Sequence, residues 1–248
     1  PSDAARSPMI AVGIAGVEDC SGGVAVIDFL GGVLHQRVDV QAGVTNLTAL
    51  PGHRLAFGDA AGRFHVLDLV RGALISSDTA LEGSVVAAPV VLDDAAAILV
   101  SQQGEIAEVD LRSARIVRVT RVPPEQGGTV RIVAEPVVSR HHGILVSIID
   151  NRRRHGRLLT FDRSHGHLET LCRFDAALYS TPILVDHRSA LLALAGFKGD
   201  PSGIAVVDLQ RRVIAPDFYP TEDYIRARPS EVKGAIYFGD YSHRLHAV

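Results

Sequence analysis

The chain has 248 residues, of which 47% are hydrophobic, and a formal net charge of −3 at pH 7. It therefore lacks the basic excess expected of a nucleic-acid-binding or membrane-surface protein, and no apolar run is long enough to cross a membrane as a helix. Tryptophan is absent and aromatic residues make up only 5%, so a large core must be mainly aliphatic.

The first eight residues, PSDAARSP, are polar and are not typical of a signal peptide. We expect residues 1–8 to form a linker and residues 9–248 to form a single domain, in the cytoplasm rather than the periplasm. Cys20 and Cys172 are too few for a disulfide framework. Each is predicted to be a small buried apolar residue, and a long-range disulfide is the alternative.

A short motif then recurs along the chain: a glycine, alternating apolar residues, and an aspartate that precedes a turn. Its copies are GGVAVIDFLGG, GRFHVLDLVRG, GEIAEVDLRSA, GRLLTFDRSHG and GIAVVDLQRR, followed by HRLHAV, which stops before the aspartate. The aspartates are Asp28, Asp68, Asp110, Asp162 and Asp208. They lie roughly 40–50 residues apart, a spacing typical of repeat architectures.

Three more strand-like segments accompany each motif. A strand led by a proline and then an apolar strand precede it, and a more polar strand follows it. The prolines are Pro89, Pro136, Pro182 and Pro229. Each unit therefore holds four short strands, and no segment shows sustained helical periodicity.

A four-stranded sheet of this size cannot bury both of its faces alone, but sheets stacked around an axis bury one another. The sequence therefore predicts an all-β fold, a β-propeller of six or seven four-stranded blades. The polar strand is expected at the outer edge, where Pro216 is tolerated. The first copy lacks its proline-led strand and the last lacks its outer strand, which leaves six or seven blades open.

The recurring aspartates are expected to be structural. An aspartate at the start of a tight turn accepts hydrogen bonds from backbone N–H groups two residues on. Gly31, Gly72 and Gly166 are expected to supply the positive φ of the same turns.

The strand order and the G-x-(I/L/F/V)-x-x-(V/L/F)-D pattern over 89–110, 136–162 and 182–208 resemble the PQQ-like (quinoprotein alcohol dehydrogenase-like) propeller repeat. The resemblance implies one of two roles. Redox members bind pyrroloquinoline quinone and Ca²⁺ in a central funnel and stack the quinone on a tryptophan. Other members are binding domains, either scaffolds of envelope-protein assembly or modules of adenylate-forming or carrier-protein enzymes.

This chain departs from the redox members, because it has no tryptophan and is about half their length. Its docking positions hold Gln36, Ser77 and Arg118. We therefore assign no quinone, calcium or other cofactor.

No nucleophile elbow, phosphate loop or H-E-x-x-H motif is present in the sequence. His165 and His167 flank a predicted hairpin tip, and His141 and His142 lie at another turn. We expect solvated turns at both places and assign no metal ligand.

Function is expected at the face that carries the loops entering the first strand and leaving the second strand of each unit, since extended loops tend to carry function. The candidate residues for binding a ligand or partner at the channel mouth are Arg131, Glu135, Tyr179, Arg226 and Arg228. The candidate loop contacts are Arg152, Arg153 and Arg154. Several arginines near one mouth suit a small anionic ligand. The alternative is a rim of arginines paired with Glu135, Glu222 and Asp223.

The sequence thus predicts a non-catalytic binding or scaffold domain whose partner is a protein or a neighbouring domain, without nucleic-acid or membrane contacts. A module of a larger multidomain enzyme fits this prediction. The alternatives are a quinone-dependent dehydrogenase, or a hydrolase or lyase that uses the funnel.

Overall fold

The computed structural model describes residues 9–16, 21–28, 30–125, 127–151, 154–196 and 199–248. All regular elements among these residues are β-strands, and no helix among them could span a membrane. The chain forms two compact units, Pro1–Leu99 with Ala107–Arg118, and Val100–Ile106 with Val119–Val248. The sheets are described in chain order, and the packing is described within each unit.

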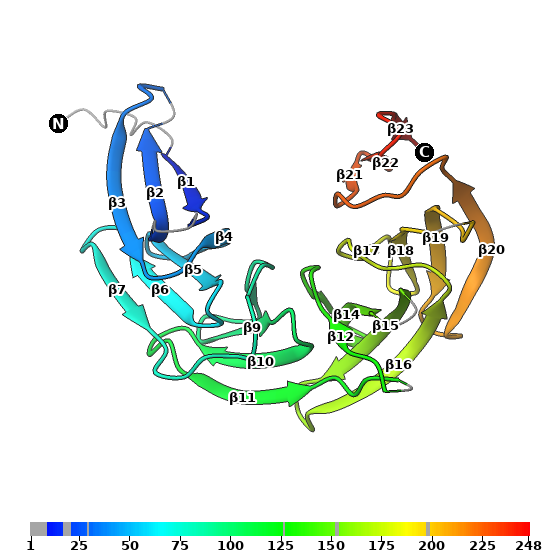
Figure 1. Cartoon of the computed structure of the whole chain (residues 1–248), viewed down its shortest axis with the longest axis horizontal. Coiled ribbons are helices and arrows are strands. Elements are labelled where there is room, and N and C mark those ends of the chain that lie inside the picture. The colour runs from blue at the N-terminus through cyan, green and yellow to red at the C-terminus, as the bar shows by residue number, and fades with distance from the viewer. Residues whose placement is uncertain (1–8, 17–20, 29, 126, 152–153, 197–198) are drawn as a thin grey trace. The chain divides into compact units, whose positions relative to one another are not determined.

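Each sheet in the N-terminal half is antiparallel and follows the chain order (Figure 1). The first contains β1 (Met9–Ile14), β2 (Gly22–Asp28) and β3 (Leu34–Val40). The second contains β4 (Val44–Leu50), β5 (Arg54–Asp59), β6 (Phe64–Asp68) and β7 (Ala73–Ser76). The third contains β8 (Val90–Val91), β9 (Ala96–Val100), β10 (Glu105–Asp110) and β11 (Ile116–Arg121).

The C-terminal half repeats the same meander. Its first sheet contains β12 (Val130–Arg131), β13 (Val137–Ser139), β14 (Gly143–Asp150), β15 (His155–Asp162) and β16 (His167–Phe174), and both β12 and β13 pair with β14. The next contains β17 (Ile183–Leu184), β18 (Ser189–Leu194), β19 (Gly203–Asp208) and β20 (Val213–Pro220). The last contains β21 (Ser230–Val232), β22 (Ala235–Gly239) and β23 (Leu245–Ala247).

The all-β prediction and the four-strand unit are confirmed by these sheets. The first and last sheets have three strands each in the described part of the chain, as the incomplete first and last copies of the motif predicted. The strands led by proline are short, with two or three residues each, and in β8 only Val90 and Val91 pair with β9. The number of blades and the closure of a ring remain predictions.

Apolar side chains bury the sheets against one another within each unit. In the first unit Phe57 of β5 packs with Val24 and Val26 of β2, and Phe64 of β6 lies in a second cluster with Leu99 of β9. In the second unit a cluster joins β14–β16 to β18 and β19. A face that one sheet cannot bury alone is therefore buried by the next sheet, which is the physical basis of the repeat.

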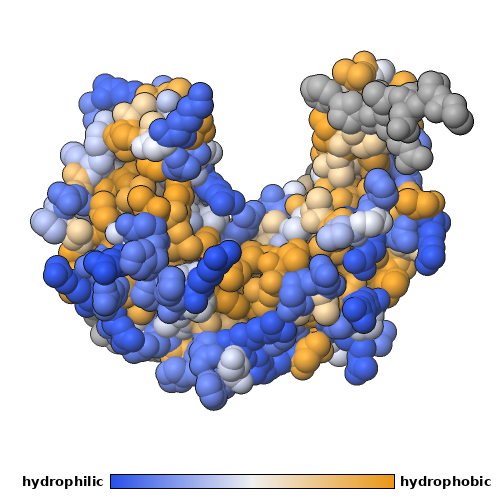
Figure 2. All heavy atoms as spheres, turned by 180° about the vertical axis from the view of Figure 1, so that it is seen from behind, coloured by the Kyte–Doolittle hydropathy of each residue, from blue (hydrophilic) through white to orange (hydrophobic). Residues whose placement is uncertain are grey.

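The outer strands carry the polar surface. In β11 partly buried and exposed residues alternate, because one face meets the sheet core and the other meets water. Pro216 lies in the edge strand β20, where the register with β19 shifts between Ala205 and Val207, so its missing N–H disrupts no regular ladder. Figure 2 shows hydrophobic residues reaching the surface in patches bordered by hydrophilic ones.

The five recurring aspartates build their turns as predicted. The Oδ1 atom of each accepts hydrogen bonds from the backbone N–H groups two and three residues on, at 2.7–3.4 Å. These contacts hold the pKa of Asp68 and Asp110 below its usual value, with the backbone of Arg71 and the hydroxyl of Ser113 as the largest causes.

The prediction that Gly31 supplies the positive φ of the first turn is wrong, because Gly32 has that conformation, with φ of 62°. Gly72 and Gly166 were predicted correctly. In all five turns the residue with positive φ comes four places after the aspartate, and two of these residues are Ala114 and Arg212. The hairpin therefore imposes its geometry even where no glycine is present.

Candidate functional site

A pocket of about 500 Å³ opens in the second unit. Strand ends and loops from three successive sheets supply its lining. The lining residues are Arg131, Ile149, Asn151, Arg154, Ala177, Tyr179, Ala195, Gly196, Tyr224 and Arg226.

Backbone pairing places these residues side by side. Arg131 ends the short strand β12 and pairs with Ile149 of β14. Ala177 forms an isolated antiparallel bridge with Ala195, which follows β18. Tyr179 lies two residues beyond Ala177 in the irregular segment that enters β17, so the same segment supplies both an alanine and an aromatic ring to the pocket.

One wall of the pocket is apolar. Ile149, Ala177 and Ala195 are 2%, 1% and 6% exposed, and the partly buried rings of Tyr179 and Tyr224 pack against them. All five residues also line the pocket. The three aliphatic residues are already covered, so a ligand that carries an apolar group would remove from water its own apolar surface and the exposed part of the Tyr179 and Tyr224 rings.

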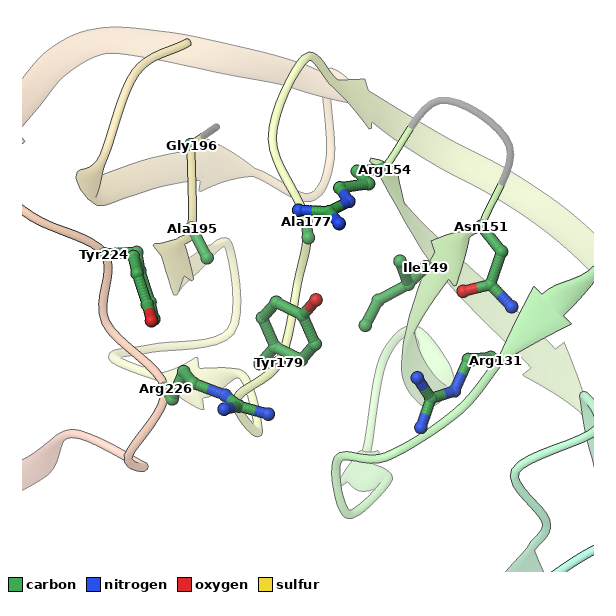
Figure 3. Close-up of a pocket in the computed structure, with 10 residues that line it drawn as sticks. All are labelled: Arg131, Ile149, Asn151, Arg154, Ala177, Tyr179, Ala195, Gly196, Tyr224 and Arg226. Atoms are coloured by element: carbon green, nitrogen blue, oxygen red, sulfur yellow. The ribbon is translucent and has the colours of Figure 1, made fainter. Parts of the chain in front are cut away.

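Three arginines surround the centre of the pocket. Figure 3 shows the guanidinium groups of Arg131 and Arg226 pointing toward one another past the Tyr179 ring, and that of Arg154 on the hydroxyl side of the same ring. None of the described residues that line the pocket is an aspartate or glutamate. Planar guanidinium groups in this arrangement suit a carboxylate or phosphate group.

Aromatic rings hold Arg226 in place. Its guanidinium carbon lies 5.0 Å from the centroid of the Tyr179 ring, and its Nη1 donates to the Tyr241 hydroxyl at 3.4 Å. Tyr241 in turn stacks on Tyr224, with ring centroids 4.2 Å apart. The Tyr241 hydroxyl and the neighbouring rings raise the pKa of Arg226, so its positive charge is fixed.

Hydrogen bonds also fix the opposite side of the pocket. The backbone N–H of Asn151 donates to the Thr129 carbonyl at 2.9 Å, and its side-chain Nδ2 donates to the Thr129 hydroxyl at 3.0 Å. Since Thr129 lies two residues before Arg131, these bonds tie the loop after β14 to the segment that carries the arginine.

A buried arginine anchors the start of that segment. Arg157 of β15 is 5% exposed, and it donates to the Pro123 carbonyl at 2.9 Å and lies 3.4 Å from a Glu125 carboxylate oxygen. Glu125 also accepts from Arg173 at 2.8 Å, and this bond is the main reason why the pKa of Glu125 is lowered. Burial lowers the pKa of Arg157, although the nearby carboxylates oppose that shift.

The structure brings together only part of the predicted site. Arg131, Tyr179 and Arg226 line the pocket, and so does Arg154. Glu135 and Arg228 lie outside the lining and form an ion pair with one another at 2.9 Å, which is the kind of pairing that the alternative described. Arg152 and Arg153 lie outside the described residues.

Some of the lining escaped the sequence analysis. Tyr224 had a detectable signal, since it stands two residues before Arg226 in an extended loop. Ala177, Ala195 and Ile149 had none, because small and aliphatic residues occur throughout the repeats.

A second polar cluster lies in the first unit. The Nε2 of His65 is 2.9 Å from Oδ2 of Asp59, and its Nδ1 is 2.7 Å from the Ser76 hydroxyl. Burial opposes ionisation of Asp59, but hydrogen bonds from His65 and from backbone N–H groups outweigh it and lower its pKa. The same Asp–His pairing recurs at Asp240 and His246, at 3.0 Å. We therefore interpret it as a structural contact that links the two strands of a hairpin.

Other described histidines make local contacts. His165 contacts Asp162 within its turn, and His142 contacts the His187 carbonyl. In the described part of the chain, no three His, Cys, Asp or Glu side chains are placed to hold a metal ion. Cys172 is a buried free thiol whose pKa is raised by burial, and Cys20 lies outside the described residues.

Comparison with known proteins identifies the fold. No protein-family model and no curated protein matches the chain. The solved structures that match include BamB from Moraxella catarrhalis, with a TM-score of 0.58 and 15% sequence identity over 98% of this chain and 88% of that chain. A likeness at this identity shows the fold alone, which is that of a β-propeller.

Proposed function

We propose that the chain is a non-catalytic β-propeller domain that binds a protein partner, or a neighbouring domain, by taking an anionic group into the pocket of the second unit. The observation that carries this proposal is the lining, in which Arg131, Arg154 and Arg226 surround Tyr179 and none of the described residues carries a carboxylate. The sequence resemblance further supports a module of a larger multidomain enzyme, whose neighbouring domain is then the partner.

The chemistry of the lining favours binding over catalysis. The pocket offers cationic donors and an apolar wall, and none of its described lining residues is a serine, cysteine, histidine or carboxylate. Arg131 is partly buried, whereas Arg154 and Arg226 are exposed, so the attraction between these guanidinium groups and an anion is screened by water and salt. Such a pocket holds an anionic group in one orientation.

Short peptides test the proposal. The probe is acetyl-Gly-Glu-Ala-Phe with a free carboxyl terminus, and its neutral counterpart is acetyl-Gly-Gln-Ala-Phe-amide. Binding is followed by tyrosine emission, since the chain has no tryptophan and three of its five tyrosines lie in or beside the pocket. We expect the anionic peptide to bind at least ~10-fold more tightly than the neutral one.

Two substitutions make the test specific. Arg131→Gln is expected to weaken binding of the anionic peptide by ~10–100-fold, as expected for loss of a charge-assisted hydrogen bond. Arg211→Gln removes the same charge from an exposed side chain elsewhere in the second unit and is expected to leave binding nearly unchanged. Equal effects of the two substitutions, or equal binding of the two peptides, would refute the proposal.

A further inference from the structure

From the shape and chemistry of the pocket we infer that its ligand is the C-terminal residue of a polypeptide, with an aromatic or large aliphatic side chain. This inference rests on the proposed function and names the anionic group. Three features of the lining carry it: the guanidinium groups, the apolar wall and one free amide oxygen.

The guanidinium groups are the reason for assigning a carboxylate to the ligand. Arg131 has no hydrogen bond or ion pair with any described residue, whereas Arg226 is already held by Tyr179 and Tyr241. Their guanidinium groups point toward one another across the pocket (Figure 3). A planar carboxylate between them can accept from both, and the held position of Arg226 lowers the entropy lost on binding.

The apolar wall accounts for the side chain. Ile149, Ala177 and Ala195, with the rings of Tyr179 and Tyr224, lie in the same 500 Å³ pocket as the arginines. An internal Asp or Glu carries its carboxylate on only one or two methylene groups and would leave the exposed part of the Tyr179 and Tyr224 rings uncovered. A C-terminal hydrophobic residue carries a carboxylate and a large apolar group on one Cα, so it contacts both parts of the lining.

The amide oxygen of Asn151 is the reason for assigning a peptide N–H to the ligand. Its Nδ2 already donates to the Thr129 hydroxyl at 3.0 Å, and Figure 3 shows its oxygen on the side that faces the pocket. This oxygen has no hydrogen-bond donor among the described residues. The backbone N–H of a bound C-terminal residue is a donor of the required kind, and a free carboxylic acid without an amide lacks it.

Two further peptides separate the possible sources of the carboxylate. Acetyl-Gly-Gln-Ala-Phe with a free carboxyl terminus keeps only the terminal carboxylate, and acetyl-Gly-Glu-Ala-Phe-amide keeps only the side-chain carboxylate. We expect the first to bind as tightly as the peptide with both groups, and the second to bind at least ~10-fold more weakly. Replacing the terminal Phe with Ala is expected to weaken binding by a similar factor, because the Phe ring then no longer leaves water to contact the Tyr179 and Tyr224 rings.

Asn151→Ala provides a second readout. It is expected to weaken binding of the free-terminus peptide by ~3–10-fold, the range for one neutral hydrogen bond, and to leave binding of 3-phenylpropanoate, which has no N–H, unchanged. Far-UV circular dichroism and thermal melts check that the variant stays folded. Equal weakening of both probes would show that Asn151 acts only by positioning the loop, and would overturn its assigned role.

The outcomes distinguish this inference from the proposed function. If the amide with an internal Glu binds as tightly as the free terminus and still depends on Arg131, the proposed function stands and the C-terminal assignment is wrong. If neither peptide exceeds the neutral one, both fail. If 3-phenylpropanoate binds as tightly as the free-terminus peptide, the pocket takes free aromatic acids, and the polypeptide assignment is overturned.

Discussion

Two adjacent glycines in the turn between β2 and β3 allow the turn geometry to be tested with one chemical change. Gly32 has a φ of 62°, whereas Gly31 is not in the left-handed region. A Cβ at Gly32 would meet nothing within 4 Å. A Cβ at Gly31 would make ordinary contacts, the nearest at 3.6 Å to Val33 and 3.7 Å to Asp28. Neither alanine is therefore sterically blocked, and only the backbone conformation separates the two sites.

The magnitude follows from two terms. Placing an L-residue in the left-handed region costs about 1–2 kcal/mol. Replacing glycine with alanine lowers the entropy of the unfolded chain, which stabilises the fold by about 0.4–1 kcal/mol. Gly32→Ala is therefore expected to destabilise the protein by about 0.5–1 kcal/mol, and Gly31→Ala to stabilise it slightly. The unfolded-state term is common to both variants, so their difference, about 1–2 kcal/mol, measures the backbone strain alone.

Urea denaturation followed by far-UV circular dichroism measures both variants against the parent protein. An unchanged m-value would show that a shifted midpoint reflects stability. Equal midpoints for the two variants, or a lower midpoint for Gly31→Ala, would refute the assignment of positive φ to the fourth residue after the aspartate. The same reasoning expects Arg212→Gly to be more stable than Arg212→Ala, since both lose the ion pair with Glu169 and only alanine keeps the strain.

Two further predictions concern charged groups. The carboxyl of Asp240 has its pKa lowered from 3.8 to about 2, because hydrogen bonds, first from the Ser242 hydroxyl and then from His246, outweigh the effect of burial. Its ionised form therefore stabilises the fold fully above about pH 4. The difference in melting temperature between the parent protein and Asp240→Asn should shrink as the pH falls from 4 to 2. A difference that stays constant over this range would contradict the prediction. Glu125→Gln should cost about 1–3 kcal/mol in urea denaturation, since it removes the carboxylate that lies 3.4 Å from the buried Arg157, while Asp150 stays nearby and Glu125 itself is partly exposed. Arg173→Gln, which loses only an exposed pair, should cost less than about 1 kcal/mol, and an equal cost would show that burial of Arg157 is not decisive.

The sequence was sufficient for features that depend on neighbouring residues. The aspartate turns follow from local hydrogen bonding, so Asp28 and Asp208 could be assigned their role without a fold. The position of the positive φ could not be chosen between Gly31 and Gly32, because either glycine can adopt it. The all-β fold followed from the repeat, since the third strand of each copy shows the same apolar pattern.

The site was only partly predictable, because it depends on backbone that is not regular. Arg226 and Arg228 are two residues apart and would share one face of a strand. The segment before β21 is not a strand, so Arg226 lines the pocket while Arg228 pairs with Glu135. The repeat predicted which loops meet, and the direction of each side chain within them depends on contacts that no local pattern records.

The turn between the third and outer strands of a sheet tolerates substitution of its glycine. Since Ala114 and Arg212 adopt the same backbone as the glycines at equivalent positions, the paired strands on either side hold the turn in shape. Each copy can then lose a signature residue at a modest cost in free energy, about one-tenth of the stability of an ordinary domain. Copies that change independently in this way stop resembling one another, and resembling other proteins, long before the individual sheets fail to form.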